Sequence, residues 1–306
     1  MSTAQRIAAS GIRILSAMSP ASAGRLATSL FFSTRPRMRV RDDDRHTHDS
    51  ALRETVDVRG RRIVTYRWGA GTRAALLMHG WSGRASQFAT LVRDLVAEGY
   101  RVYAFDAPAH GASAGFRTDV RDWIAAAQRI SDTDGPLDLV VGHSFGAFAA
   151  LAAVRGGLRA DRIVSIAGAG RVDAFFDEFA RTLRMSTRTR TAFEASFHRR
   201  LGMSRAETDA QFDSLIEPLP PGTELLVIHD ADDRALAARN AADLHAAHAE
   251  RSRLLLTHGL GHNRPLGSDA VLDAVLAFAD DGVTGLDVAR IGSGDGDREG
   301  TQRRAT

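Results

Sequence analysis

The chain of 306 residues contains no cysteine, which excludes a disulfide framework, a thiol nucleophile and a thiolate metal site. It also contains no lysine, so its basic residues are all arginine and almost nothing titrates between neutral pH and strong alkali. A formal net charge of +3 therefore coexists with a pI near 10.0. The high pI is weak evidence for a nucleic-acid partner, and we expect none.

Long apolar runs are missing as well. The longest, Phe145–Val154, has about half the length that a membrane-spanning helix needs. The amino terminus lacks the continuous apolar core of a signal peptide, because Arg13 interrupts its apolar residues. These absences predict a cytoplasmic protein. The apolar share of 44% and the charged share of 25% are typical of a globular chain with a sizeable core.

The N-terminal region, residues 1–50, differs in pattern from the rest. In residues 1–33 apolar side chains recur at helical spacing, with Ser19 as an N-cap and Pro20 at the first helical position. Two short amphipathic helices are predicted, docked on the main domain or on a second subunit, with contact to a membrane surface as the alternative. Residues 34–50 are rich in charge and are expected to form a solvated linker.

Beyond this region, segments of strand character alternate with segments of helical periodicity. The alternation predicts an α/β fold, with a mostly parallel sheet of about eight strands, helices on both faces and an opening hairpin at Arg59-Gly60. The predicted strands are Thr55–Val58, Ile63–Trp68, Ala74–Met78, Arg101–Phe105, Leu137–Val141, Arg162–Ile166, Glu224–Ile228 and Arg253–Thr257. The predicted helices are Ala85–Glu98, Asp119–Ile130, Gly146–Leu158, Ala235–Ala249 and Ser268–Ala279.

Residues 171–220 interrupt the alternation. They hold no strand candidate and contain six of the fourteen phenylalanines. We expect a helical cap inserted into a core that spans residues 51–170 and 221–282, with its phenylalanines building the core of the cap, lining a pocket, or both. Residues 283–306 are rich in Gly, Asp and Arg and are expected to be a flexible tail.

The strongest chemical signal is the sequence GHSFG at residues 142–146, between an apolar strand and an alanine-rich helix. A serine at so sharp a strand-to-helix turn stands out from the sheet edge in a strained backbone, and close approach requires glycine on both sides. Ser144 is therefore the candidate nucleophile. The N–H of Phe145, at the amino end of the helix, is one candidate donor to an oxyanion.

The sequence HGWSG at residues 79–83 follows another predicted strand. A loop at this place can offer a backbone N–H to the same oxyanion. Trp81 is thus the second candidate donor, through its main chain.

A serine hydroxyl needs a base to become a nucleophile, and the base needs an acid to orient it. Both are expected after the serine, each following a late strand, in the order acid and then histidine. The segment IHDADD at 228–233 offers three aspartates after one strand, and HGLGH at 258–262 offers two histidines after the last.

Taken together, residues 52–281 resemble the α/β-hydrolase superfamily, in its serine-hydrolase branch with a helical cap. The resemblance lies in HGWSG at 79–83, FDAPAHGASAG at 105–115, GHSFGA at 142–147 and the acid and histidine segments.

This resemblance selects among the open candidates. The family places its acid three residues beyond a glycine, a position that Asp230 occupies here, and this implies Asp233 as the acid, with Asp232 as the alternative. The histidine of the family follows Gly-x-Gly, which implies His262 rather than His258. The aspartate at 230 adds a carboxylate that puts the choice of acid in doubt.

The implied activity is a serine hydrolase that cleaves an ester, thioester or related acyl bond through Ser144, His262 and Asp233 and an acyl-enzyme. No metal or organic cofactor is implied. Acyl transfer to another acceptor, a peroxide included, and a catalytically silent fold that binds a ligand are the alternatives. The phenylalanine-rich cap favours an apolar substrate. Ala109 stands where the family often has glycine, which leaves the local geometry of that loop in doubt.

Overall fold

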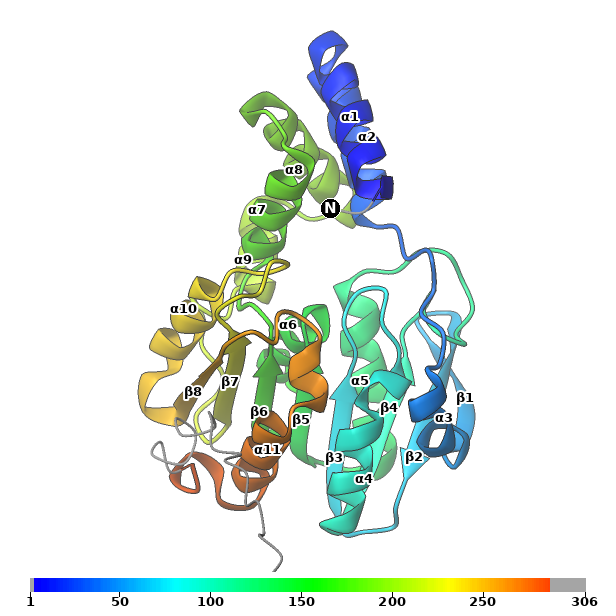
Figure 1. Cartoon of the computed structure of the whole chain (residues 1–306), viewed down its shortest axis with the longest axis vertical. Helices are drawn as coiled ribbons and strands as arrows, with labels where there is room; N and C mark the ends of the chain where they lie inside the picture. The colour runs from blue at the N-terminus through cyan, green and yellow to red at the C-terminus, as the bar shows by residue number, and fades with distance from the viewer. Residues whose placement is uncertain (1–2, 287–306) are drawn as a thin grey trace, which may run out of the picture.

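The computed structural model describes residues 3–286 and shows a central sheet between layers of helices (Figure 1). The strands of the described part are β1 (Leu52–Val58), β2 (Arg61–Trp68), β3 (Arg73–Met78), β4 (Tyr100–Asp106), β5 (Leu137–His143), β6 (Ala160–Ile166), β7 (Glu224–Asp230) and β8 (Ser252–Thr257). Their order in the sheet is β1-β2-β4-β3-β5-β6-β7-β8. β2 is antiparallel to both of its neighbours, and the other pairs are parallel. The predicted α/β fold class is confirmed, as are the predicted strands and the opening hairpin.

The inner strands are buried on both faces because successive side chains of a strand point to opposite sides of the sheet. In β3, Ala74, Leu76 and Met78 belong to one core cluster, whereas Ala75 and Leu77 belong to the other. This explains why the inner strands read as continuous apolar runs in the sequence.

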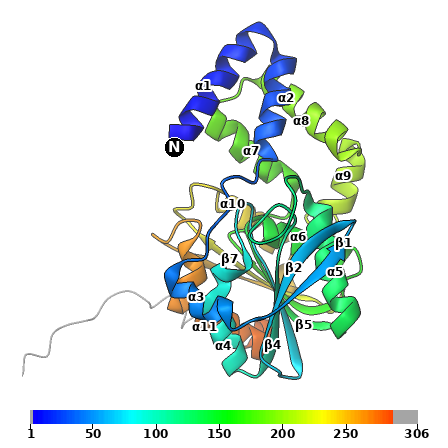
Figure 2. The same ribbon diagram turned by 90° about the vertical axis from the view of Figure 1, so that its right-hand side faces the viewer.

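Five helices cover the two faces of the sheet (Figures 1 and 2). One core cluster receives side chains from α5 (Val120–Asp134), α6 (Phe145–Arg155) and α10 (Arg239–His248), and the other from α4 (Ala89–Ala97) and α11 (Asp269–Asp281). Each overlaps a segment for which the periodicity predicts a helix, although α5 and α11 end later than predicted and α6 begins one residue earlier. A short 3₁₀ turn, Ala85–Phe88, precedes α4.

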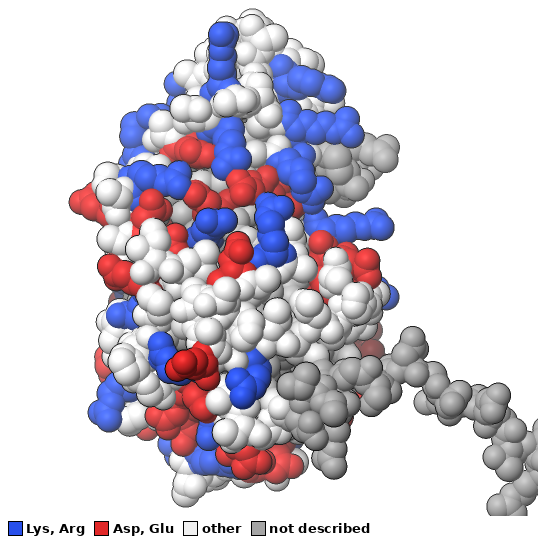
Figure 3. Space-filling model, turned by 90° about the vertical axis from the view of Figure 1, so that its left-hand side faces the viewer, with Lys and Arg blue, Asp and Glu red and all other residues white. Residues whose placement is uncertain are grey.

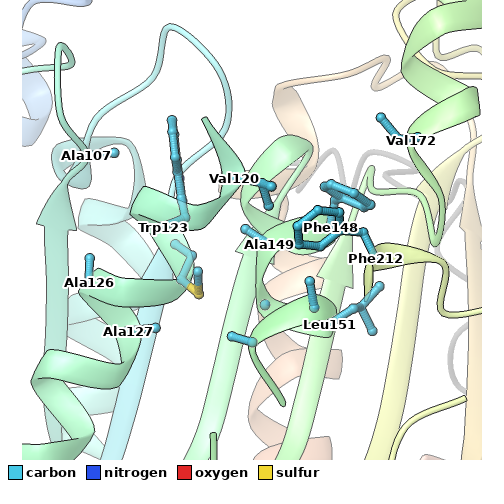
Figure 4. Close-up of a cluster of buried hydrophobic side chains, with 14 of the residues drawn as sticks. Ala107, Val120, Trp123, Ala126, Ala127, Phe148, Ala149, Leu151, Val172 and Phe212 are labelled. Atoms are coloured by element: carbon cyan, nitrogen blue, oxygen red, sulfur yellow. The ribbon is translucent and has the colours of Figure 1, made fainter. Parts of the chain in front are cut away.

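Helix α5 shows how local sequence determines the bounds of such a helix. Asp119 caps its first turn by accepting a hydrogen bond from the N–H of Arg121, and Gly135 ends it with a positive φ of 94°. Trp123, Ala126, Ala127 and Ile130 recur every three or four residues and bury one face. Figure 4 shows Trp123, Ala126 and Ala127 beside Phe148 and Leu151 of α6 in one apolar layer.

Residues 171–220 fold as three helices without a strand: α7 (Val172–Leu183), α8 (Thr187–Leu201) and α9 (Arg205–Phe212). We call this segment the α7–α9 insertion; it lies above the carboxyl ends of the parallel strands (Figure 1). Phe176 builds its interior, with its ring centroid 4.7 Å from that of Phe197. Phe175 and Phe179 line a cavity instead. The phenylalanines of the insertion therefore both build its interior and line a pocket.

The two N-terminal helices, α1 (Thr3–Met18) and α2 (Pro20–Phe31), form a hairpin beside the α7–α9 insertion (Figures 1 and 2). Ser19 and Pro20 start α2 as the sequence indicates. A Cβ at Gly24 of α2 would overlap Ala192 of α8, so the two helices pack closely. The hairpin thus docks on its own chain. None of the described helices combines the length and the apolar character needed to cross a bilayer.

Two predicted boundaries are wrong. The expected linker at residues 34–50 contains a helix, α3 (Asp42–Asp49), whose three leading aspartates suit the positive amino end of a helix. The indole Nε1 of Trp68 also anchors it by donating to the carbonyl of Thr47, at 2.7 Å. The expected tail begins too early, because Val283 and Leu286 are buried against the core. The rest of the predicted tail, residues 287–306, lies outside the described residues.

The opening hairpin is tied to α5 by a buried carboxylate. Asp122 has no exposed surface, and it accepts hydrogen bonds from Arg59 (2.8 Å), Arg61 and Thr118 (2.9 Å). We predict that Asp122→Ala lowers the free energy of unfolding by about 2–3 kcal/mol, since it removes these charge-assisted bonds while the half-exposed arginines keep access to water.

Urea unfolding measures this change, with Asp132→Ala as the control. Asp132 is an exposed carboxylate of the same helix that, within residues 3–286, accepts a hydrogen bond only from Gln128. Its loss should change the free energy of unfolding by less than about 0.5 kcal/mol. Equal effects of the two substitutions would contradict the role of the buried carboxylate.

Candidate active site

Ser144 sits at the turn between β5 and α6 in a strained backbone conformation, with φ 54° and ψ −118°. The turn is so close to the neighbouring loop that a Cβ at Gly146 would collide with the carbonyl oxygens of Met78 and His79. A Cβ at Gly142 would collide with Ala147. The two glycines that flank the serine are therefore required by contact, as the sequence predicts.

A hydrogen-bonded chain of side chains leads away from Ser144. The Oγ of Ser144 lies 2.9 Å from Nε2 of His262, and Nδ1 of His262 lies 2.7 Å from Oδ2 of Asp233. Since the Nδ1–H of His262 donates a hydrogen bond to the carboxylate, Nε2 is free to accept a hydrogen bond from the hydroxyl of Ser144. The serine comes from the end of β5, and the acid and the histidine from the loops after β7 and β8.

Asp233 is held as a carboxylate by several donors. Its Oδ1 accepts from the N–H groups of Ala235 (2.7 Å) and Leu236 (3.1 Å), and Nε2 of His229 lies 3.2 Å from its Oδ2. Burial alone would raise its pKa, but the hydrogen bonds from His229 and His262 hold the pKa of Asp233 below the ordinary value. Asp233 therefore stays ionised and can accept the hydrogen bond from Nδ1 of His262.

The other two aspartates of the segment do not contact His262. Asp230 is fully buried and accepts from the N–H groups of Leu260 and Gly261, each at 2.9 Å. It thereby shapes the loop that carries His262. Asp232 accepts from the N–H of Gly259, at 2.9 Å.

This geometry separates the sequence candidates. Of the three aspartates, the structure brings Asp233 onto His262, and neither of the others. Of the two histidines, it brings His262 to Ser144, whereas His258 is exposed on the same loop. Sequence reasoning gave no role to His229, which contacts the acid, although it stands in the acid segment itself.

The loop at 79–83 packs directly on the serine turn. A Cβ at Gly80 would lie 3.0 Å from the Cβ of Ser144, and the rings of Trp81 and Phe145 meet edge to face at 5.1 Å. Within residues 3–286, the backbone N–H groups of Trp81 and Phe145 donate to no protein acceptor. Both predicted donors are thus unpaired beside the serine. The indole of Trp81 is fixed elsewhere, because its Nε1 donates to the carbonyl of Ser33 at 2.7 Å.

The loop that contains Ala109 keeps the conformation that glycine would adopt. Ala109 has a positive φ of 66°, and its N–H donates to the carbonyl of Ala114 at 2.9 Å. The next residue, His110, accepts from the N–H of Ser82 at 3.0 Å and so holds the loop at 79–83. Alanine at this position therefore adopts a conformation that carries some backbone strain.

Ser144 and His262 line a cavity of about 1250 Å³ between the sheet and the helices above it. The N-terminal hairpin and the α7–α9 insertion both contribute walls: Leu30 and Phe31 come from α2, and Phe175 and Phe179 from α7. The ring of Phe31 lies 5.1 Å from that of Phe179. An apolar surface therefore faces the serine from two distant parts of the chain.

Comparison with known proteins agrees with this fold. A sequence model described as the alpha/beta hydrolase family matches residues 75–276, most of the chain. The chain belongs to the alpha/beta hydrolase family. No curated protein matches it significantly in sequence.

Several solved alpha/beta hydrolase structures resemble the chain in fold. The esterase Pf2001 of Pyrococcus furiosus aligns over 80% of this chain and 95% of its own, with a TM-score of 0.61 and 16% identity. Mouse alpha/beta hydrolase domain-containing protein 10 covers 76% of this chain and 98% of its own, with a TM-score of 0.58 and 18% identity. The thioesterase domain from the curacin biosynthetic pathway covers 77% and 99%, with a TM-score of 0.54 and 16% identity.

The strain at Ser144 of this alpha/beta hydrolase gives a first prediction for the site. We expect Ser144→Gly to have a free energy of unfolding about 1 kcal/mol higher than Ser144→Ala, because glycine adopts the positive φ without a Cβ penalty. Thermal unfolding of the two variants measures the difference, which corresponds to roughly 2 °C in Tm for a domain of this size. Both variants lack the hydroxyl, so only the backbone term differs; a less stable glycine variant would contradict the strain.

Buried neutral histidines give a second prediction. Burial lowers the pKa of His110 and of His143 to about 3. In the unfolded chain each of these imidazoles binds a proton near pH 6.5, whereas in the folded chain each stays neutral until about pH 3. Stability is therefore lost as pH falls through this window, by about 1.4 kcal/mol per pH unit for each histidine.

Urea unfolding at a series of pH values from neutral to about pH 5 measures this slope. The glutamine side chain in His110→Gln can still accept the hydrogen bond from the N–H of Ser82 but does not titrate. The number of protons taken up on unfolding near pH 5, which the slope of the unfolding free energy against pH measures, should therefore fall by about one. An unchanged slope would show that His110 is not kept neutral by the fold.

Proposed function

We propose that this alpha/beta hydrolase is a serine hydrolase that cleaves an ester or thioester through an acyl-enzyme. The observation that carries the proposal is the unbroken hydrogen-bonded chain from Ser144 through His262 to Asp233, at the floor of a large cavity. The names of the structural neighbours, which include an esterase and a thioesterase domain, support the same class of reaction.

In the first half of the reaction, Oγ of Ser144 attacks the acyl carbonyl carbon while Nε2 of His262 takes the hydroxyl proton. Asp233 keeps the imidazole in the tautomer that can accept this proton and stabilises the imidazolium. The N–H groups of Trp81 and Phe145 bind the negative oxygen of the tetrahedral intermediate. His262 then returns the proton to the leaving alcohol or thiol as its bond to the acyl carbon breaks.

In the second half, a water molecule attacks the acyl-enzyme while His262 takes one of its protons. The bond between the acyl carbon and Ser144 breaks, the proton passes to Oγ, and the carboxylic acid leaves. The apolar surface of Phe31, Phe175 and Phe179 favours an acyl chain over a small polar group beside the serine. We therefore propose an apolar acyl substrate.

The test is a panel of p-nitrophenyl esters and acyl thioesters of varied chain length, together with a fluorophosphonate probe that labels activated serines. Ser144→Ala should lose labelling and lower kcat by roughly 10⁶-fold, and Asp233→Asn should lower kcat by about 10⁴-fold because the tautomer of His262 is then wrong. His262→Ala should resemble the serine variant.

His258→Ala is the matched control, since this histidine is exposed on the same loop, and it should keep the native rate. Labelling that persists in Ser144→Ala would point to another nucleophile and overturn the mechanism. A native chain that is neither labelled nor active would instead favour a ligand-binding fold. Product analysis with alcohol or amine acceptors separates hydrolysis from acyl transfer.

A further inference from the structure

The cavity that Ser144 lines has apolar side chains and also arginines in its lining. The arginines come from separate segments of the chain: Arg35 after α2, Arg181 and Arg184 at the end of α7, Arg234 beside the acid, and Arg264 beside the histidine. We call these five residues the arginine rim. The fold brings them to one opening from four places in the sequence.

Few carboxylates balance this charge. The cavity lining contains two, Glu178 and Asp232, and both are engaged: Glu178 pairs with Arg181, and Asp232 accepts from the N–H of Gly259. Among the described residues no carboxylate lies within 4.0 Å of the guanidinium nitrogens of the other four rim arginines. Figure 3 shows one face of the molecule, on which basic side chains outnumber acidic ones over the upper, helical part.

Other arginines of the insertion are partly paired and partly not. Arg190 pairs with Asp177 and Glu194, and Arg205 with Asp173 and Asp209. Among the described residues, three further arginines of α8 have no carboxylate within 4.0 Å: Arg188, Arg199 and Arg200. The arginine rim differs from these because its members line the cavity of Ser144. Like charges gathered at one opening repel each other, and an anionic ligand removes this cost while it gains charge-assisted hydrogen bonds.

We propose that the substrate is an acyl ester or thioester that also carries an anionic group, a phosphate or a carboxylate, bound by the arginine rim. The inference rests on the proposed function and extends it to the substrate class. The acyl carbonyl lies at Ser144, the apolar part of the substrate lies against Phe31 and Phe175, and the anion lies at the opening. A volume of about 1250 Å³ leaves room for a substrate of this length.

Two substrate pairs tell on which side of the scissile bond the anion lies. Mono-p-nitrophenyl adipate against p-nitrophenyl hexanoate places a carboxylate on the acyl side. Hexanoyl-coenzyme A against the hexanoyl thioester of N-acetylcysteamine places phosphates on the leaving-group side. In at least one pair, the anionic member should have a kcat/KM about 10-fold higher or more at low salt, and high salt should reduce this ratio.

Arg184→Gln and Arg234→Gln should each reduce the preference for the anion about 5- to 10-fold, mainly through KM, and leave the rate on the neutral member of each pair unchanged. The control is Arg159→Gln, an exposed arginine next to the start of β6 at the opposite end of the sheet. Equal rates on both members of both pairs, or rim variants that behave like the control, would overturn the proposal.

A binding experiment on Ser144→Ala separates this inference from the proposed function. Calorimetry should show octyl phosphate binding about 10-fold more tightly than neutral octyl glucoside, and the additional substitution Arg234→Gln should abolish the difference. Selective binding of octyl phosphate by a chain that cleaves no ester would sustain the anion site and refute the hydrolase. Ester cleavage by the native chain, with no preference for octyl phosphate in Ser144→Ala, would sustain the hydrolase and refute the anion site.

Discussion

The close contact between the loops after β3 and β5 is the constraint on which the rest of the site depends. Met78 pairs with Gly142 in the parallel register, so the two strands end side by side. Their loops can pass only because Gly146 has no side chain where the carbonyl oxygens of Met78 and His79 lie. At this contact Ser144 has its strained conformation, and the loop that carries Trp81 packs on the serine turn.

Buried carboxylates at strand ends hold the surrounding loops. Asp106, at the end of β4, accepts from the N–H groups of Ala85 and Ala112, and Asp230, at the end of β7, accepts from those of Leu260 and Gly261. Each carboxylate loses its hydration on burial and recovers hydrogen bonds from backbone donors that would otherwise be unsatisfied. Among the carboxylates near the site, Asp233 therefore contacts His262, whereas Asp106 and Asp230 position loops.

The cavity belongs to no single segment of the chain. Although Ile7, Ile14 and Met18 of the N-terminal hairpin are exposed, the hairpin and the α7–α9 insertion both contribute apolar side chains to one core cluster. Phe31 illustrates this, since its ring contacts Phe179 and Phe193 of the insertion and also lines the cavity. The N-terminal hairpin and Ser33 after it thus form part of the cavity wall, and the indole of Trp81 ties them to the loop at 79–83 through the carbonyl of Ser33.

The sequence by itself determined the fold class, the strand order along the chain, the serine turn and the segments that hold the acid and the base. These depend on local patterns: apolar runs, helical periodicity, and glycines at close approach. The helix within residues 34–50 was not predicted from the sequence, because its stability comes from contacts such as the hydrogen bond from Trp68 to Thr47 and not from an apolar stripe. Only the tertiary structure decided which carboxylate meets His262, because Asp230, Asp232 and Asp233 lie within four residues and differ in the direction that the turn after β7 gives them. Likewise, only the tertiary structure brings Phe31 and the arginine rim to one cavity, since residues so far apart in the sequence meet through packing that no local pattern encodes.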